Sequence, residues 1–307
     1  MGIFSILAYL SAQEVSRKPY EQKPVLIVKE KSVFDTASTT AQAVFVFDPT
    51  TGETLYEKNA DLELPLASVA KIMTAIVASE YSTSTIITVD RQFLNVEGDN
   101  GLFSGENWKI RDILSFALSV SSNDAMEAVA SHIGSSMANT ENLAVGKNFF
   151  VDAMNKKATS LNLVHTHFFN PTGLDTKDGT NGAYGSAHDV AVMLWHGVKN
   201  FPTIFSTTAE SRAEFTSENN KHHTAINTNP LVKTLPGIIA SKTGFTDIAG
   251  GNLAMAFIAG NTEMPFVAVV LGSTFDERFE DMNTLIRLTR KYMVEYENSL
   301  TTAEWNN

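Results

Sequence analysis

The sequence has no cysteine and comparatively few basic residues. Because Cys is 0, thiol nucleophiles, disulfides and thiolate metal sites are excluded. Lys and Arg total 23 against 34 Asp and Glu, which gives a formal net charge of −11. Binding to a nucleic-acid backbone depends on clustered positive charge, so we expect no nucleic-acid partner.

The apolar run at the N-terminus, Gly2–Leu10, is too short for a membrane-spanning helix, which needs about 20 residues. It also lacks the basic start of a secretory leader, because no Lys or Arg precedes Arg17. We interpret residues 1–24 either as the remnant of a leader or anchor, or as an unstructured or artificial tail. Any membrane attachment would come from this end, because the C-terminal tail, residues 299–307, is not a basic amphipathic segment.

The composition, 43% apolar and 19% charged over 307 residues, is that of a folded globular protein with one large domain or two modest ones. Strands are expected at residues 25–28, 43–47, 54–56, 85–89, 238–241, 252–259 and 266–271. Helices are expected at residues 65–81, 110–118, 148–161, 187–198 and 277–296, with another that begins at Asp124 as its N-cap and has Glu127 as a capping-box partner. This order predicts an α/β fold whose sheet combines both ends of the chain, with a helical insert at about residues 90–200.

Ser68-Val-Ala-Lys71 is the only Ser-x-x-Lys motif in the chain. A spacing of three residues places both side chains on one face of a helix. A serine hydroxyl becomes an effective nucleophile when a base accepts its proton, and a lysine can act as that base when burial or another cation lowers its pKa. About one such motif is expected by chance in a chain of this length, so alone the pair is more simply explained as a helix-start serine beside a solvated lysine.

Two further motifs contain residues suited to a polar substrate. Ser121-Ser-Asn lies in a break between two predicted helices, where polar side chains either cap helix ends or contact a ligand. Lys242-Thr-Gly follows a predicted strand, where Lys and Thr would suit a carboxylate and Gly would let another backbone approach. Each motif also has a purely structural interpretation, as a helix cap or as a turn.

Taken together, the three motifs occur in the order typical of penicillin-recognising serine enzymes. The chain resembles the D-alanyl-D-alanine carboxypeptidase family, the low-molecular-weight penicillin-binding proteins. The segments that carry the resemblance are Pro65-Leu-Ala-Ser-Val-Ala-Lys-Ile-Met-Thr-Ala75, Ser122-Asn-Asp-Ala125, Phe169-Asn-Pro-Thr-Gly-Leu-Asp175, Ser186-Ala-His-Asp189, Asn227-Thr-Asn229 and Lys242-Thr-Gly-Phe-Thr-Asp247. The resemblance implies a β-lactamase/transpeptidase-like α/β fold: an antiparallel sheet flanked by helices, with a helical subdomain, in one catalytic domain at residues 25–298.

The resemblance also implies which side chains carry out acyl transfer. Ser68 would attack the carbonyl between two D-alanines of a peptidoglycan stem peptide, and Lys71 would accept its proton. Ser121 and Lys242 would help move protons to the leaving amine. Water would then release the acyl-enzyme, and β-lactams would acylate Ser68 as substrate mimics.

The remaining roles in the same interpretation concern substrate binding. Asn123 would hold the substrate amide, and Thr243, with Lys242, would bind the terminal carboxylate beside Gly244. The backbone N–H groups of Ser68 and Phe245 would form the oxyanion hole. No cofactor or metal is implied, and an enzyme of this kind would act outside the cytoplasm, in the periplasm or at the cell surface.

Three alternatives remain open. A class A β-lactamase shares the fold and the motif order, but it needs a Glu-x-x-Leu-Asn element, which this sequence lacks. A wall-binding protein with an inactive site would belong to a different functional class. An endopeptidase or transpeptidase would use the same acyl-enzyme. A metal site at His165-Thr-His or His222-His is not favoured, because no carboxylate lies at ligand spacing.

Overall fold

The structure, a computed structural model, describes residues 32–95, 101–176, 178–260 and 263–304, so the strand expected at residues 25–28 lies outside the described residues. The strands are β1 (Ala43–Phe47), β2 (Thr54–Lys58), β3 (Leu64–Pro65), β4 (Ile86–Val89), β5 (Glu106–Lys109), β6 (His167–Phe168), β7 (Ala183–Gly185), β8 (Arg212–Thr216), β9 (His222–Ile226), β10 (Ile238–Thr246), β11 (Gly250–Ile258) and β12 (Pro265–Ser273). The α-helices are α1 (Lys71–Tyr81), α2 (Ile110–Val120), α3 (Asn123–Met137), α4 (Leu143–Ser160), α5 (Ala187–Asn200), α6 (Pro202–Phe205) and α7 (Glu277–Glu304). Short 3-10 helices are η1 (Val33–Thr36), η2 (Ala67–Ala70), η3 (Arg91–Asn95), η4 (Ser206–Ala209) and η5 (Pro230–Lys233).

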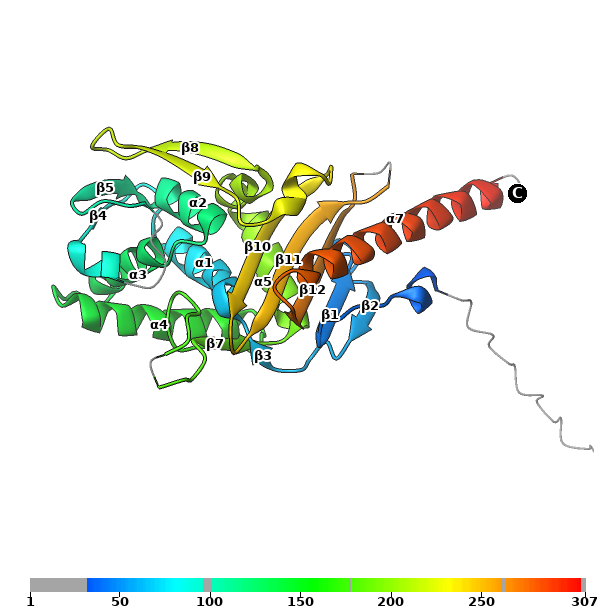
Figure 1. The fold of residues 1–307 in the computed structure, drawn as a ribbon, viewed down its shortest axis with the longest axis horizontal. Helices are drawn as coiled ribbons and strands as arrows, with labels where there is room; N and C mark the ends of the chain where they lie inside the picture. The colour runs from blue at the N-terminus through cyan, green and yellow to red at the C-terminus, as the bar shows by residue number, and fades with distance from the viewer. Residues whose placement is uncertain (1–31, 96–100, 177, 261–262, 305–307) are drawn as a thin grey trace, which may run out of the picture. The chain divides into compact units, whose positions relative to one another are not determined.

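The central sheet has the strand order β10-β11-β12-β1-β2, and every neighbouring pair in it is antiparallel (Figure 1). Strands β1 and β2 come from the start of the described chain, whereas β10 to β12 come from its last third. The predicted α/β architecture, with a sheet built from both ends of the chain, is therefore confirmed.

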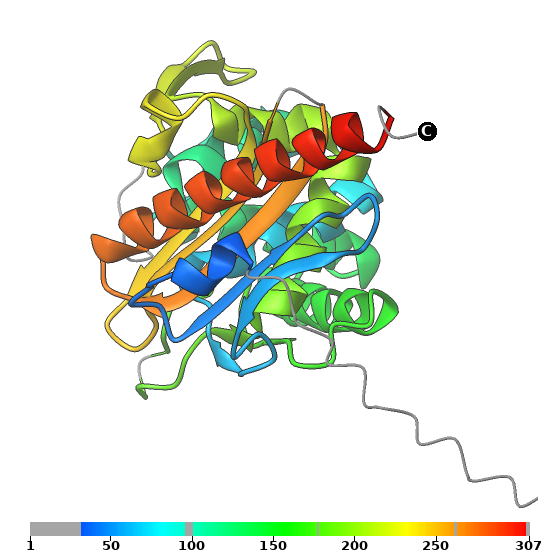
Figure 2. The same cartoon turned by 90° about the vertical axis from the view of Figure 1, so that its right-hand side faces the viewer.

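Both faces of this sheet are covered, because its inner strands are apolar on both sides. Along β1, Val44 and Val46 pack into the core beneath α7, while Ala43 and Phe45 pack into the core shared with the helical region. Figure 2 shows α7 running across one face of the sheet. The opposite face is contacted by α5 and by η2, which leads into α1. Such continuous apolar strands are typical of a sheet buried on both faces.

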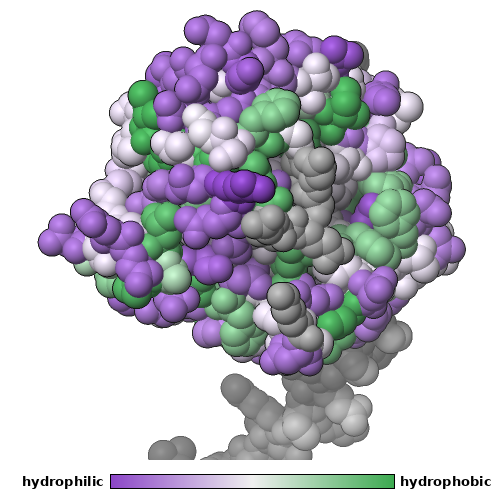
Figure 3. Space-filling view, turned by 60° about the vertical axis from the view of Figure 1, so that its left-hand side comes forward, coloured by the Kyte–Doolittle hydropathy of each residue, from purple (hydrophilic) through white to green (hydrophobic). Residues whose placement is uncertain are grey.

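The helical region consists mainly of α1 to α5, and α1 lies inside it. Ile72, Met73, Ala75 and Ile76 on α1 are all fully buried, as their apolar pattern predicts. The surface of this region is largely hydrophilic, with apolar patches between the polar side chains (Figure 3). This packing holds α1, and the segment that precedes it, in a fixed position against the sheet.

Three predicted helix starts are wrong. The helix expected at residues 148–161 begins five residues earlier, at Leu143, because Asn142 caps α4. The helix expected at residues 65–81 begins only at Lys71, because β3 and the 3-10 helix η2 occupy its first residues. The next correction concerns α3, whose N-cap is Ser122 and not Asp124: the Ser122 hydroxyl accepts a hydrogen bond from Ala125 N. A serine oxygen reaches the N3 amide from the N-cap position, and this contact fixes the helix start two residues earlier.

Candidate active site

The segment that carries Ser68 is held between the sheet and the loop that contains Gly173. Ser68 lies in η2, immediately before α1, and it follows Ala67, which has a left-handed φ of 47°. A Cβ atom on Gly173 would lie 1.9 Å from the carbonyl oxygen of Ala67, so only glycine permits this approach. The strained conformation is kept by its surroundings, which is a common feature of functional segments.

Lys71 contacts Ser68 directly, as the spacing of three residues predicts. The Lys71 Nζ–Ser68 Oγ distance is 2.7 Å, and Nζ also donates a hydrogen bond to the carbonyl oxygen of Thr172 at 2.8 Å. Lys71 is fully buried. Burial lowers the pKa of Lys71 well below its usual range, and the charge of Lys242 lowers it further, while Glu127 raises it. A lysine with a lowered pKa can be neutral and accept the proton of a serine hydroxyl.

Ser121 and Lys242 form a second hydrogen-bonded pair. Ser121 ends α2 in a left-handed conformation, with a φ of 63°. Lys242 extends from β10, and its Nζ donates to Ser121 Oγ and to the carbonyl oxygen of Thr243, both at 2.8 Å. Burial, followed by the charge of Arg278, lowers the pKa of Lys242 to about 7. This pair can exchange protons close to neutral pH.

Asn123 is the first residue of α3, and it is buried directly after Ser121 and Ser122 in the chain. Its neighbour Ser122 serves the helix, because the side chain caps α3. The start of α3 therefore fixes the directions in which the side chains of Ser121 and Asn123 extend from the backbone. The middle position of the motif has a structural role here, and the outer two positions remain for chemistry.

Gly244 allows β10 to pass close to the segment of Ser68. A Cβ atom at Gly244 would lie 2.8 Å from Leu66 O, 3.1 Å from Val69 N and 3.2 Å from Ser68 N. The predicted reason for glycine at this position, a close approach of two backbones, is therefore confirmed.

The residues on either side of Gly244 differ in exposure. Thr243 is buried, and its Oγ1 lies 2.6 Å from Thr228 Oγ1. Phe245 is 42% exposed. The structure thus brings the three predicted motifs together at one edge of β10, next to Ser68.

Comparison with known proteins agrees with this arrangement. Residues 29–274 match the D-alanyl-D-alanine carboxypeptidase family. The chain belongs to this family. The predicted resemblance to this family is thereby confirmed.

Individual relatives of this D-alanyl-D-alanine carboxypeptidase family member agree with the assignment. The D-alanyl-D-alanine carboxypeptidase DacF of Bacillus subtilis is 32% identical over 241 residues, which cover 76% of this chain and 58% of the relative, less than two thirds of its length. A D-alanyl-D-alanine endopeptidase of Pseudomonas aeruginosa is 32% identical over 69% of this chain and 66% of the relative. The crystal structure of a D-alanyl-D-alanine carboxypeptidase from Mycobacterium tuberculosis has a TM-score of 0.71 and 28% identity, and it covers 82% of this chain and 91% of that chain.

Residues outside the three motifs complete the site of this family member. The carbonyl of Thr172, which contacts Lys71, is presented by a turn in which Asn170 Oδ1 accepts hydrogen bonds from Thr172 N at 3.1 Å and from Gly173 N at 2.8 Å. The resemblance includes this segment and Asn227–Asn229, which contains Thr228, but spacing alone assigns no role to either. Arg278 stands in no motif, so the sequence offered no signal for it.

The remaining polar clusters form no metal site among the described residues, where no group of three or more His, Cys, Asp or Glu side chains is arranged to hold an ion. His223 Nε2 instead lies 2.8 Å from Glu106 Oε1 in the interior, and His222 Nδ1 lies 3.0 Å from Thr216 Oγ1. No helix within the described ranges has the length and apolarity needed to cross a membrane.

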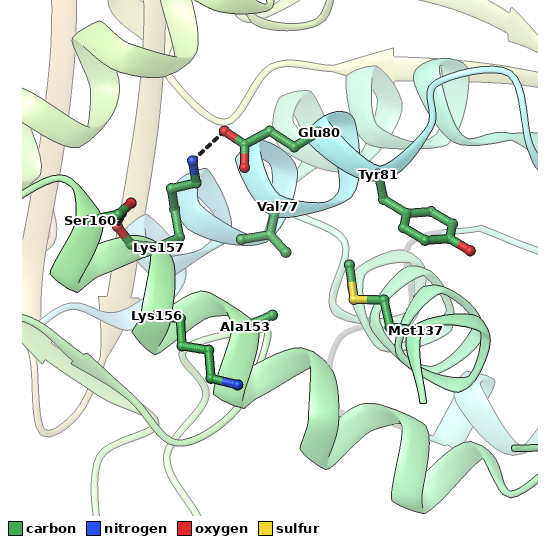
Figure 4. A pocket seen from close by; sticks show the side chains of 8 residues that line it. All are labelled: Val77, Glu80, Tyr81, Met137, Ala153, Lys156, Lys157 and Ser160. Carbon is green, nitrogen blue, oxygen red and sulfur yellow. Dashed lines mark hydrogen bonds and ion pairs between the residues drawn. The ribbon is translucent and has the colours of Figure 1, made fainter. Parts of the chain in front are cut away.

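A separate groove of about 430 Å³ lies where α1, α3 and α4 meet (Figure 4). Val77 and Met137 contribute apolar side chains to it, and Lys157 forms an ion pair with Glu80 across 2.5 Å. None of its lining residues belongs to the site around Ser68. The second lysine of the groove, Lys156, places its Nζ 5.7 Å from the ring centroid of Phe149.

Proposed function

We propose that this protein is a serine-type D-Ala-D-Ala carboxypeptidase, which removes the terminal D-alanine of peptidoglycan stem peptides through an acyl-enzyme on Ser68. The observation that carries the proposal is the 2.7 Å contact between Ser68 Oγ and the buried amine of Lys71. A neutral lysine at this distance can accept the hydroxyl proton while the oxygen attacks the substrate carbonyl.

The first half-reaction makes one bond and breaks one bond. Ser68 Oγ bonds to the carbonyl carbon of the penultimate D-alanine, and its proton passes to Lys71. The tetrahedral intermediate then collapses, the bond to the terminal D-alanine breaks, and Ser121, linked to Lys242, delivers a proton to the leaving amine. The N–H groups of Ser68 and Phe245 stabilise the oxyanion, a contribution of about 3 kcal/mol for a typical donor.

Substrate binding falls to the residues around this centre. Asn123 holds an amide of the stem peptide. Lys242 and Thr243 bind the terminal carboxylate, and the contact of Thr243 with Thr228 orients the threonine hydroxyl. A water molecule takes the place of the leaving amine and hydrolyses the acyl-enzyme. β-Lactams acylate Ser68 in the same way.

We further propose a location and a domain organisation for this enzyme. Peptidoglycan lies outside the cytoplasm, so we place the enzyme in the periplasm or at the cell surface. Residues 25–298 act as one catalytic domain.

Mass spectrometry tests the proposal directly. Wild type incubated with a penicillin should gain one adduct, and a pentapeptide ending in D-Ala-D-Ala should lose one D-alanine. Ser68→Ala should abolish both results. An adduct that persists in Ser68→Ala would refute the assignment of the nucleophile, and an intact wild type that forms no adduct would favour a non-catalytic wall-binding protein.

Two further assays distinguish the proposed carboxypeptidase from other enzymes that form the same kind of acyl-enzyme. Repeated, rapid hydrolysis of nitrocefin would indicate a β-lactamase, which the missing Glu-x-x-Leu-Asn element argues against. Cleavage of cross-linked dimers of stem peptides, with little release of D-alanine from the pentapeptide, would indicate an endopeptidase, the activity named for the Pseudomonas aeruginosa relative.

A further inference from the structure

Arg278, the second residue of α7, reaches the active-site strand from the opposite side of the sheet to Ser68. Its Nη1 donates a hydrogen bond to the carbonyl oxygen of Gly244 at 2.7 Å, and the side chain is only 4% exposed. The start of α7 lies against the ends of the long sheet strands (Figure 2). One buried cation on the last helix thus contacts the Lys242-Thr-Gly segment directly.

The environment of this guanidinium is unfavourable for a charge. Among the described residues, no carboxylate forms an ion pair with Arg278, and its buried Nε has no hydrogen-bond partner. Burial lowers the pKa of Arg278 to about 10, and Asp276 only partly opposes this effect. A buried charge without an ionic partner is destabilising, so its presence calls for a reason other than stability.

Aromatic rings hold the guanidinium in place. Its central carbon lies 4.4 Å from the ring centroid of Phe275, 4.6 Å from that of Phe279 and 6.0 Å from that of Phe245. Phe245 and Phe275 meet edge to face at 5.0 Å. Cation–π contacts of this kind fix the plane of the guanidinium and therefore the direction of its hydrogen bond.

The hydrogen bond acts on one particular peptide group. The carbonyl of Gly244 and the N–H of Phe245 belong to the same planar amide, in which they point in opposite directions. A cationic donor at the carbonyl oxygen withdraws electron density from the amide and makes its N–H a stronger donor. The hydrogen bond that the Gly244 carbonyl accepts on the α7 side therefore makes the Phe245 N–H a stronger donor on the Ser68 side.

We propose that Arg278 is a positioning residue for acyl transfer, which polarises and orients the Gly244–Phe245 peptide so that the Phe245 N–H can stabilise the oxyanion. This inference rests on the proposed function, because that function assigns an oxyanion-hole role to Phe245. Arg278 does not touch the substrate and acts only through the peptide and through its charge.

The charge of Arg278 has a second, measurable effect on the site. Lys242 is faced by Ser121 at the end of α2, by Lys71 on α1 and by Arg278 on α7, and the Arg278 charge lowers its pKa. Loss of that charge should therefore raise the pKa of Lys242 from about 7. One limb of the profile of acylation rate against pH is set by the titration of Lys242. This pH limb should move to higher pH by the same amount as the pKa of Lys242.

Three substitutions of Arg278 separate its hydrogen bond from its charge. Arg278→Gln keeps an N–H donor without charge, Arg278→Lys keeps the charge without the planar fork, and Arg278→Leu removes both. Arg290→Gln is the matched control, because Arg290 on the same helix also donates to a backbone carbonyl, that of Pro236, at 2.8 Å. Each variant is acylated with a fluorescent penicillin across a pH series, and its melting temperature is recorded.

We expect acylation to fall about 10- to 100-fold in Arg278→Gln and further in Arg278→Leu, with at most a 10-fold loss in Arg278→Lys, because a whole oxyanion donor is worth about 100- to 1,000-fold. The pH limb should shift upward in the two neutral variants only. The infrared stretch of the acyl-enzyme carbonyl should move to higher wavenumber in Arg278→Gln, because its oxyanion-hole hydrogen bonds are weaker. Arg290→Gln should match wild type in all three measurements.

Two results would overturn the inference. The first is wild-type acylation and carbonyl frequency in Arg278→Gln. The second is an equal loss of rate in all Arg278 variants that follows the melting temperature, with no shift in pH limb or carbonyl frequency, as a structural role would produce. Should Arg278→Leu not fold, Arg278→Gln and Arg278→Lys decide alone. Failure of wild type to form an adduct would count against the proposed function itself, which distinguishes the two failures.

Discussion

Lys71 and Lys242 are two amines held in the interior of one protein, and their burial gives them their chemistry. Burial lowers the pKa of both; in addition, the charge of Arg278 lowers the pKa of Lys242, and the charge of Lys242 lowers the pKa of Lys71. A lysine in water is protonated at neutral pH and cannot act as a base. The site therefore obtains a base from a residue that is ordinarily an acid, at the cost of some stability of the fold.

This cost should appear as a pH dependence of stability. The unfolded chain holds the Lys242 proton up to about pH 10.4, whereas the folded protein releases it at about pH 7. Between these values the unfolded state binds more protons, so stability rises with pH; below about pH 7 both states are protonated, so the pH dependence vanishes and the cost of burying the charged amine is largest. Urea unfolding measures the increase in the free energy of unfolding between pH 7.5 and pH 9.5. We expect this increase to be about 2 kcal/mol smaller in Lys242→Met than in wild type. The exposed Lys199→Met should keep the wild-type increase.

Gly244 offers a steric test of the same site. In Gly244→Ala the new methyl group would meet the backbone atoms Leu66 O, Val69 N and Ser68 N, at 2.8, 3.1 and 3.2 Å. We expect the Ser68 segment to be displaced and penicillin acylation to fall more than about 100-fold, since a misplacement of about 1 Å costs that much. Gly185→Ala serves as the control, because its close neighbours are side-chain atoms of Thr166 and Leu66, which can shift. Equal acylation rates in the two variants would contradict this account.

At the scale of elements, the breaks between helices matter more to the site than the helices themselves. Ser121 lies at the end of α2, Asn123 at the start of α3, and Ser68 in the 3-10 helix before α1. The periodicity of apolar residues predicts the bodies of these helices well. It does not predict their first turns, because capping and the approach of a neighbouring strand decide those. Asp124 and Ser122 are both good N-cap residues, so sequence alone could not choose between them.

The cap of α3 can be tested against the cap of α4. Ser122 Oγ accepts from Ala125 N at 3.1 Å, and Asn142 Oδ1 accepts from Ala144 N and Val145 N at 3.1 and 3.2 Å. Ser122→Ala and Asn142→Ala should each lower the free energy of unfolding by about 1 kcal/mol.

Only the first substitution should also slow acylation, because Ser122 alone stands between Ser121 and Asn123. Ser122→Gly should restore most of the stability, since glycine is a tolerable N-cap. Urea unfolding and penicillin acylation measure the two effects separately, and slower acylation in Asn142→Ala would show that helix stability in general controls the rate.

For the whole molecule, the order of strands and helices was predictable because long apolar strands and periodic helices carry strong signals. The hairpins β4–β5 and β8–β9 were predicted only in part or not at all. In β8 and β9 the inward positions include Phe215, Ala225 and the polar His223, so no run of apolar residues marks them. The buried contact of His223 with Glu106 replaces an apolar contact and is visible only after folding. Arg278 was missed for a similar reason, since its partners lie far away in the sequence.

A sheet built from both ends of the chain requires a connection that closes it, and Asp281 provides one. This buried carboxylate accepts hydrogen bonds from Thr40 N, Thr40 Oγ1, Ala41 N and Ser273 Oγ at 2.9, 3.0, 2.9 and 2.8 Å. It thereby joins the start of β1 to the end of β12 and to α7. Contacts this distant in sequence must offset the entropy of closing a long loop, so we expect their loss to lower stability.

Asp281→Ala should leave two backbone donors and two hydroxyl groups without their acceptor, and the expected loss is about 3 kcal/mol in the free energy of unfolding. For a domain of this size, that loss corresponds to a fall in melting temperature of about 10 °C. Asp281→Asn, which keeps one carbonyl oxygen, should lose less, and the exposed Asp152→Ala should lose nothing measurable. At 10 °C, where the variant remains folded, the fraction of molecules that penicillin acylates should equal that of wild type. Asp281 holds the two ends of the chain together without contacting Ser68. An acylated fraction that falls while the melting temperature is unchanged would mean that Asp281 acts on the site and not on the closure of the sheet.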